Sequence, residues 1–240
     1  MFRLSNLHFG NYKKFNWVSY FMINHENRLQ IDFSKETELS NTEKALIFPS
    51  IQNFQKGEAS DGVHLLHCVR RYAAKKHDPD YMEAMKWFVR EENQHSAYLK
   101  KYMDYYDIPV RKNSTLDRIF RNLRKLGGLK GEVIVLVTAE MIALSYYSAL
   151  SECTDSPVLK RICRQMLHDE LRHVVFQSCT LSKLKIHPFE NLLRILLMET
   201  TVAVVWFSMA DVFRSGGYTF RRLLRDSLGY LKQSIDISNT

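Results

Sequence analysis

The stretch EENQH at positions 91–95 has a counterpart further along the chain, DELRH at positions 169–173. Both contain Glu-x-x-His, and in both an acid directly precedes the Glu. Residues three apart lie on one face of a helix, so each pair can direct a carboxylate and an imidazole toward one place. One such pair is weak evidence for a metal site, because glutamate and histidine are common on surfaces. Two matching pairs are stronger evidence.

A helical glutamate stands upstream of each pair, Glu58 before the first and Glu140 before the second. In the second half, Glu140 and Glu170 are equally far from the turn around Pro157, roughly 20 Å at the rise of an α-helix. They should therefore face each other across a hairpin. In the first hairpin, the distances of Glu58 and Glu92 from the turn match less well.

One Glu from each of two helices, with Glu-x-x-His from each of two others, is the ligand arrangement of di-iron carboxylate bundles. Four carboxylates with two imidazoles suit iron or manganese better than magnesium, calcium or zinc. We therefore expect an all-α fold, a ferritin-like four-helix bundle, holding two iron ions or a manganese–iron pair. The predicted metal-binding and catalytic residues are Glu58, Glu92, His95, Glu140, Glu170 and His173.

The surroundings of Glu140 predict that it is buried, because the stretch 133–144 is otherwise almost entirely apolar. A buried carboxylate without a cation costs several kcal/mol or takes up a proton. A neutral or salt-bridged core glutamate is the alternative. The acids before the two motifs are predicted to bond to the histidines, Asp169 to His95 and Glu91 to His173, since metal-bound histidine usually donates its second N–H to a carboxylate. The alternative for both is a solvated charge.

The two motifs resemble the paired motifs of soluble acyl-carrier-protein desaturases. Residues 140–147, continued to His173, are similar to the second hairpin of cyanobacterial aldehyde-deformylating oxygenases. The resemblance covers about residues 50–180. It implies a ferritin-like, oxygen-activating di-iron family, with the family's ligands on the six residues given above.

Prolines and glycines divide the chain into helices, with prolines at first helical positions. We expect one domain over 1–240: an irregular N-terminal arm over 1–45, a four-helix di-iron core over 49–185 and extra helices over 187–235. A short helix is expected after Ser40 and another at 115–124. The expected core helices are 49–74, 79–106, 130–152 and 157–185, and the extra helices are 188–213 and one that ends near 235.

The composition favours an acidic partner or an ordinary basic surface, because the net charge is +8. The four cysteines form no Cys-x-x-Cys pair, which indicates reduced thiols in a cytoplasmic protein rather than an iron–sulfur or zinc site. No signal peptide is evident. The apolar stretch 192–213 contains Arg194, Glu199 and Asp211, and we interpret it as a buried helix rather than a membrane span.

Further residues have both a functional and a packing interpretation. Tyr147, Tyr98 and Trp87 are candidate redox-active neighbours of the metals, or packing aromatics. Thr138 either faces an oxygen pocket or bonds to its own helix. His64 and His67 should not be ligands, whereas Asp61 is on the ligand face. The last helix carries arginines that either form a solvated face or bind an acidic carrier or electron donor: Arg214, Arg221, Arg222 and Arg225.

These observations favour a di-iron oxidase or oxygenase that hydroxylates, desaturates or similarly oxidises a small hydrophobic or acyl substrate. Electrons would come from an external ferredoxin or flavoprotein, and an acidic carrier protein is a candidate partner. A homodimer without a membrane span is the expected form. The apolar segment 188–213 could line a channel for the substrate. The alternatives are a ferroxidase or peroxide-scavenging ferritin-like protein, a tRNA-modifying di-iron hydroxylase and a metal-free interaction protein.

Overall fold

The computed structural model describes residues 2–4, 15–59, 62–111 and 127–239. These residues form helices and, within the same ranges, no strand. The predicted all-α fold is confirmed. The predicted short helix at 115–124 and the candidate Asp61 lie outside the described residues.

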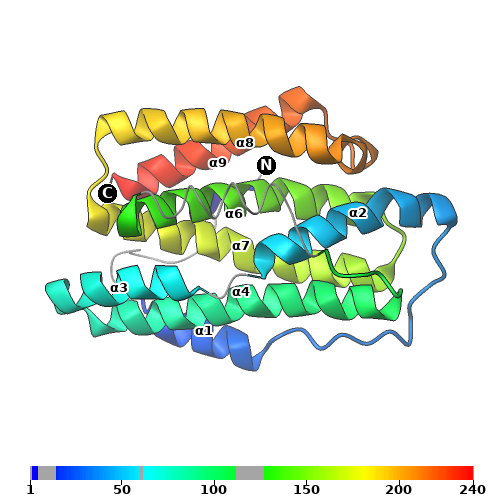
Figure 1. The fold of residues 1–240 in the computed structure, drawn as a ribbon, viewed down its shortest axis with the longest axis horizontal. Helices are drawn as coiled ribbons and strands as arrows, with labels where there is room; N and C mark the ends of the chain where they lie inside the picture. The colour runs from blue at the N-terminus through cyan, green and yellow to red at the C-terminus, as the bar shows by residue number, and fades with distance from the viewer. Residues whose placement is uncertain (1, 5–14, 60–61, 112–126, 240) are drawn as a thin grey trace.

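The centre of the molecule is an antiparallel hairpin of α6 (Gly128–Glu152) and α7 (Pro157–Leu184), which share the most extensive helix–helix contact (Figure 1). Beside it runs α4 (Pro79–Tyr105). Along α4 lie α2 (Asn41–Glu58) and then α3 (Val63–Lys76), one after the other and antiparallel to it (Figure 1). These helices surround the predicted site.

Two of the predicted helix starts are confirmed by their caps. The Asp78 side chain accepts a hydrogen bond from Tyr81 N before α4 (3.0 Å), and Ser156 accepts one from Leu159 N before α7 (2.9 Å). In each case a proline follows the cap. The first N–H groups of a helix have no partner within the helix, so proline, which lacks an N–H, costs no hydrogen bond there. The capping residues thereby fix where the two helices that contain the Glu-x-x-His pairs begin.

The predicted helix 49–74 is wrong in two respects. The helix begins at Asn41, capped by Ser40, so Pro49 lies inside α2 and the expected short helix after Ser40 is its first part. The chain then leaves the helix after Glu58 and begins α3 at Val63. Gly62 has a left-handed backbone (φ 63°), and a Cβ at this position would lie 2.6 Å from Val89.

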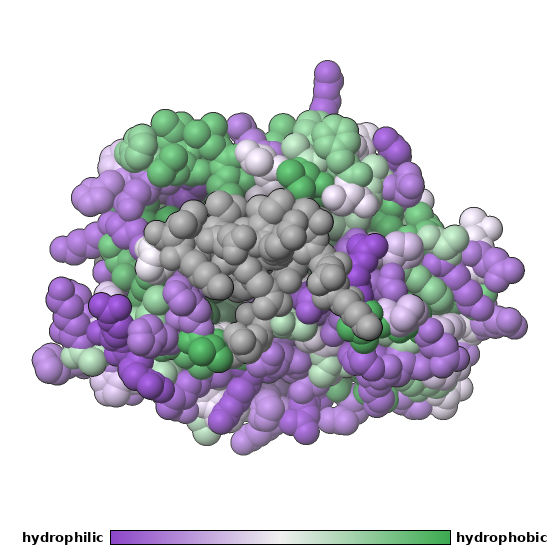
Figure 2. All heavy atoms as spheres, in the orientation of Figure 1, coloured by the Kyte–Doolittle hydropathy of each residue, from purple (hydrophilic) through white to green (hydrophobic). Residues whose placement is uncertain are grey.

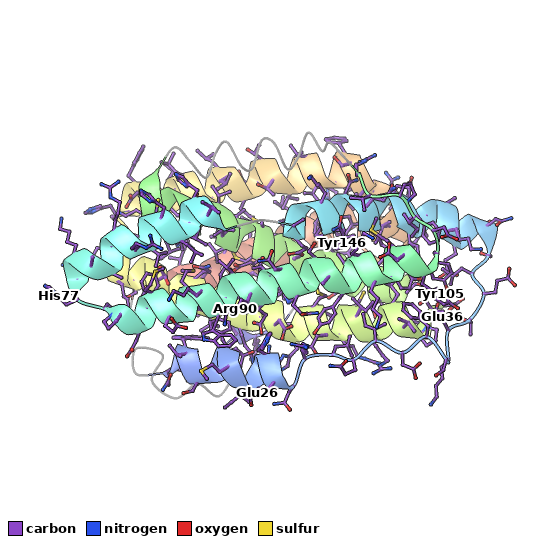
Figure 3. The ribbon with its side chains drawn as sticks, turned by 60° about the horizontal axis from the view of Figure 1, so that its bottom comes forward. Glu26, Glu36, His77, Arg90, Tyr105 and Tyr146 are labelled. Carbon is purple, nitrogen blue, oxygen red and sulfur yellow. The ribbon has the colours of Figure 1, made fainter. Side chains whose placement is uncertain are left out.

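The N-terminal arm is not irregular throughout, because Trp17–Glu26 forms α1. This helix packs along α4, on the side of the bundle opposite α8 and α9 (Figure 1; Figure 3 labels Glu26 at its end). Its buried Phe21 contacts the rings of Phe88 and Phe176. This part of the arm thus packs as a helix on the outer side of the core.

The opposite side is covered by α8 (Pro188–Ser215) and α9 (Phe220–Ser238). The chain turns between them at Gly216, where a Cβ would lie 2.4 Å from the carbonyl oxygen of Ala149. Only glycine allows this close approach to the end of α6. The main contacts of α8 are with α6 and α9. It therefore lies on the outside of α6 rather than beside the predicted site.

The interpretation of 192–213 as a buried helix is wrong for one of its faces. Phe207 is 86% exposed and Leu192 is 52% exposed, and Figure 2 shows hydrophobic side chains gathered along the edge formed by α8. By length and composition alone, α6 and α8 are the two helices of the described chain that could cross a membrane. Most of α6 is buried in the bundle, whereas much of α8 is not.

Candidate metal centre

The two Glu-x-x-His pairs meet between α4 and α7. Glu92 and His95 come from α4, and Glu170 and His173 come from α7. One ligand atom from each of these four side chains lies within 4.8 Å of the others. The spacing of three residues places both members of a pair on the same side of its helix. The structure therefore brings together two carboxylates and two imidazoles in the interior of the bundle.

Each histidine is held from behind by the acid that precedes the opposite motif. His95 donates from Nε2 to Asp169 (3.1 Å), and His173 donates from Nε2 to Glu91 (2.8 Å). Both predicted contacts are confirmed. Because each bond crosses from one helix to the other, the two motifs orient each other's imidazole rings. The Nδ1 atom of each ring is left facing the cluster.

The Nδ1 atoms lie among carboxylate oxygens. His173 Nδ1 is 2.8 Å from Glu92 Oε1, and His95 Nδ1 is 3.5 Å from Glu170 Oε1. Neither contact has the geometry of a hydrogen bond. Buried polar atoms without a partner are rare in proteins, and each needs a physical reason. Among the described residues, the buried atoms at this centre without a hydrogen-bond partner are Glu92 Oε1, His95 Nδ1, Glu140 Oε1, Glu140 Oε2, Glu170 Oε2 and His173 Nδ1.

Glu58 and Glu140 approach the same centre from the remaining helices. Glu140 lies in the middle of α6 and is 4% exposed, and Glu58 is the last residue of α2. Both interact electrostatically with Glu92 and Glu170. Tyr147 donates a hydrogen bond to Glu58 Oε1 (2.7 Å). All six predicted residues thus point into one buried region, although Glu58 and Glu140 stand outside the tightest group of four.

The crowding of acids has a strong effect on these two glutamates. Burial and the charges of Glu92 and Glu170 raise the pKa of Glu58 to about 8. Burial likewise raises the pKa of Glu140 well above its usual range. Without a cation, both carboxyl groups are therefore protonated near neutral pH. A cation at this centre would displace those protons.

His95, His173 and Glu170 are charged in the absence of metal. Burial alone would lower the pKa of His95 and of His173, but hydrogen bonds to neighbouring carboxylates raise both pKa values well above the usual range. Burial would raise the pKa of Glu170, yet the positive charges of the two adjacent histidines lower it. In the absence of metal, the protonated imidazoles therefore neutralise the carboxylates that metal cations would neutralise.

A further layer of side chains around the acids was not predicted from the sequence. Asn24 on α1 donates from its amide to both Glu91 and Asp169 (2.9 Å to the latter), so one side chain joins the two histidine–acid pairs. Gln165 and the exposed His168 also bond to Asp169. Gln165 is one turn before Asp169 on the same helix, which is a usable signal. Asn24 belongs to another part of the chain and gives none.

The remaining candidates divide clearly. Tyr147 contacts a predicted ligand, as described above. Tyr98 is buried on the side of Glu91 and Asp169, while Trp87 packs against His25 and Arg90 near the surface. Thr138 donates to the carbonyl of Ile134, the alternative in which it bonds to its own helix. Two histidines of α3 lie apart from the cluster: His64 is bonded to Glu132, and His67 is exposed.

The donor set could hold a metal ion. Imidazole nitrogens and carboxylate oxygens without hydrogen-bond partners lie side by side, and transition-metal ions bind such mixed nitrogen and oxygen ligands. The chain matches no family model, no curated protein and no solved structure. The case for a metal therefore rests on the geometry of this centre: an all-helical bundle with a buried carboxylate and histidine cluster that is compatible with a di-iron site.

Proposed function

We propose that this chain is a di-iron oxidoreductase that uses O₂ to oxidise a small hydrophobic or acyl substrate. The observation that carries the proposal is the pair of Nδ1 atoms of His95 and His173. Both are buried among carboxylates, and in the described part of the chain neither has a hydrogen-bond partner. Their Nε2 atoms are already bonded to Asp169 and Glu91. A manganese–iron pair would fit the same residues.

The protein would hold the ions with His95 and Glu92 from α4 and with His173 and Glu170 from α7. Glu58 and Glu140 would complete the set from α2 and α6. When bound, two ferrous ions supply the electrons that reduce O₂. Asp169 and Glu91 keep the imidazole rings in the orientation that presents Nδ1. The buried position of these side chains excludes bulk water from the reacting region.

A hydrophobic substrate is supported by what surrounds the cluster. Phe88 packs edge-on against the His173 ring (4.8 Å between centroids), and Phe21 lies close to the same ring. On the other side, Phe54 stacks on Tyr146, which Figure 3 labels between α2 and α6. Residues 91–95 and 169–173 also resemble motifs of acyl-carrier-protein desaturases. An external ferredoxin or flavoprotein would supply electrons, and the net charge of +8 suits an acidic partner.

The proposal is tested by loading the metal-free protein with Fe(II) under anaerobic conditions. We expect about two irons per chain for a dinuclear site, followed by O₂ consumption when air is admitted. His173→Ala should lose both properties. His64→Ala removes an exposed histidine away from the cluster and should retain both. Equal iron content in the two variants would contradict the proposal.

Iron loading and three further measurements separate the other functions considered for this chain. A protein that binds no iron after reconstitution would be the metal-free alternative. A large cage in light scattering, with iron oxidation that no organic compound stimulates, would indicate a ferroxidase. RNA that copurifies and dissociates with salt would indicate a tRNA-modifying hydroxylase. Acceleration of O₂ consumption by fatty acyl compounds supports the proposed substrate class.

A further inference from the structure

The exposed face of α8 forms an apolar ridge. The ridge consists of apolar side chains that follow one side of the helix at steps of three or four residues, with the exposed Thr200 in the one longer step. It extends for about 27 Å along the helix axis. Its large members, all exposed, are Phe189, Leu193, Leu196, Val204 and Phe207. Phe207 projects furthest, with 86% of its surface exposed.

Charged side chains avoid this ridge between its two phenylalanines. Arg194 is fully buried on the opposite face, and Glu190 forms an ion pair with Lys130 (2.9 Å). Glu199 is exposed but, at 100° per residue, lies at the margin of the ridge rather than on it. An exposed apolar surface of this kind, interrupted by the uncharged Thr200, marks an interaction site.

The inner face of α8 is fixed to the bundle, so the helix cannot separate from it and cross a membrane. Met198 and Val202 are completely buried. The guanidinium of Arg194 donates to Ser234 on α9 (2.6 Å) and to Asn191 (3.2 Å). Pulling α8 away would expose this core and leave a buried cation without its partners. Only the outer face is available for contact.

Basic side chains stand at the C-terminal end of the ridge. Arg214 follows Phe207 beyond a kink at Met209 in α8, is 62% exposed and pairs with Asp211 (3.4 Å). At the start of α9, Phe220 is partly exposed and contacts the Trp206 ring, and the exposed Arg221 follows it. An apolar face ending in arginines is complementary to an anionic lipid surface, where acyl chains take up the apolar groups and headgroups pair with the cations.

We propose that the apolar ridge of α8 docks the protein, with the helix in the plane of the interface, onto membranes containing anionic phospholipid. A second copy of the chain fits less well. Both copies would carry +8, so two chains repel each other. This inference is independent of the metal centre.

The test is cosedimentation of the intact protein with vesicles of phosphatidylcholine alone or with about one third phosphatidylglycerol. We expect binding to the anionic vesicles and little to the neutral ones. Phe207→Glu should weaken binding at least about tenfold, because it replaces a large inserted side chain with a charge. Val63→Glu places the same charge on another exposed apolar residue, in α3, and should leave binding unchanged.

A second pair of variants tests the basic end of the ridge. Arg214→Gln with Arg221→Gln should reduce the preference for phosphatidylglycerol more than Arg70→Gln with Arg71→Gln, which removes the same charge from α3. If Phe207→Glu does not fold, as judged by circular dichroism, Leu196→Glu serves in its place. Absence of vesicle binding, binding unaffected by the ridge variant, or equal effects of the two arginine pairs would overturn the proposal. The proposal would also be overturned if the protein does not bind vesicles but forms a dimer, and Phe207→Glu dissociates that dimer.

Discussion

The two halves of the core supply equivalent residues to the centre but are built differently. In the α6–α7 half, Glu140 stands in the middle of an unbroken helix and, as far as the described residues show, neither carboxylate oxygen has a hydrogen-bond partner. In the other half, Glu58 is the final residue of α2, and the chain leaves the helix directly after it. Its carboxylate is held by Tyr147, which belongs to α6.

This difference indicates how each glutamate is positioned. The helix on both sides of Glu140 fixes its backbone, so the side chain can remain without partners until a cation arrives. Glu58 at a helix end has less backbone support, and a hydrogen bond from the opposite half compensates for it. We infer that α6 orders both halves of the centre, with Glu140 as a ligand and Tyr147 as a positioning residue.

The largest expected effect is the loss of Glu140. Glu140→Gln should weaken iron binding by about a hundredfold, since a neutral amide replaces a charged ligand. Glu132→Gln is the matched control, because it makes the same change at another buried glutamate of α6. Titration with Fe(II) under anaerobic conditions measures both. Similar affinities for the two variants would show that Glu140 is an ordinary core residue.

The next effect concerns the stability of the metal-free protein. Glu58 has a pKa of about 8 in the folded chain and 4.5 as its ordinary value, so the folded state binds more protons between these pH values. Its contribution to stability is therefore present at pH 4.5 and is lost as the pH rises through 8. Glu58→Gln removes this loss and should stabilise the metal-free protein at pH 9 by on the order of 2 kcal/mol.

Urea unfolding with a chelator at pH 5 and pH 9 measures the effect. The gain from Glu58→Gln should be much smaller at pH 5, where the wild-type carboxyl is already protonated. With iron present the order should reverse, and the variant should be the less stable protein, because it binds the metal more weakly. A variant that is less stable at pH 9 without metal would show that Glu58 is stabilised as a carboxylate.

A smaller effect is expected outside the predicted ligands. Asn24→Ala removes the amide that joins Glu91 to Asp169, and residues at this distance from a metal typically change its affinity by about tenfold. Asn27→Ala, three residues later at the exposed end of α1, is the control. Iron affinity should fall only in the first variant. Unchanged affinity would mean that α1 merely covers the core.

The smallest effect should come from Tyr147→Phe, which removes one hydrogen bond to Glu58 and no ligand. The cost should be about 1 kcal/mol, or about fivefold in iron affinity. Combined with Glu58→Gln, the second substitution should add little, because the two residues act through the same contact. Additive effects in this double variant would contradict the assignment of Tyr147 as the residue that positions Glu58.

The features predicted correctly share a local origin in the sequence. The spacing of Glu92 and His95, repeated at Glu170 and His173, reflects helix geometry, which short-range patterns report well. The acids beside the motifs were recognisable for the same reason. The contacts of His95 with Asp169 and of His173 with Glu91 follow once the two helices are placed side by side.

The features that sequence reasoning missed depend on long-range contacts. The break after Glu58 is required because Gly62 approaches Val89 on another helix, so the reason for it lies outside the segment itself. Asn24 reaches the acids because the packing of Phe21 holds α1 against the core, and no periodic pattern in the sequence predicts this packing. The exposure of α8 was missed because an apolar helix has the same composition whether its second face meets protein or remains open.

The central claim, that the cluster between α4 and α7 holds a pair of metal ions, is tested most directly by crystallography of the iron-loaded protein. Data collected on both sides of the iron absorption edge locate iron without reference to activity. The account predicts two anomalous peaks between the helices, one beside Nδ1 of His95 and one beside Nδ1 of His173. A fully loaded crystal with no peak there, with a single peak, or with iron only on the surface would contradict it.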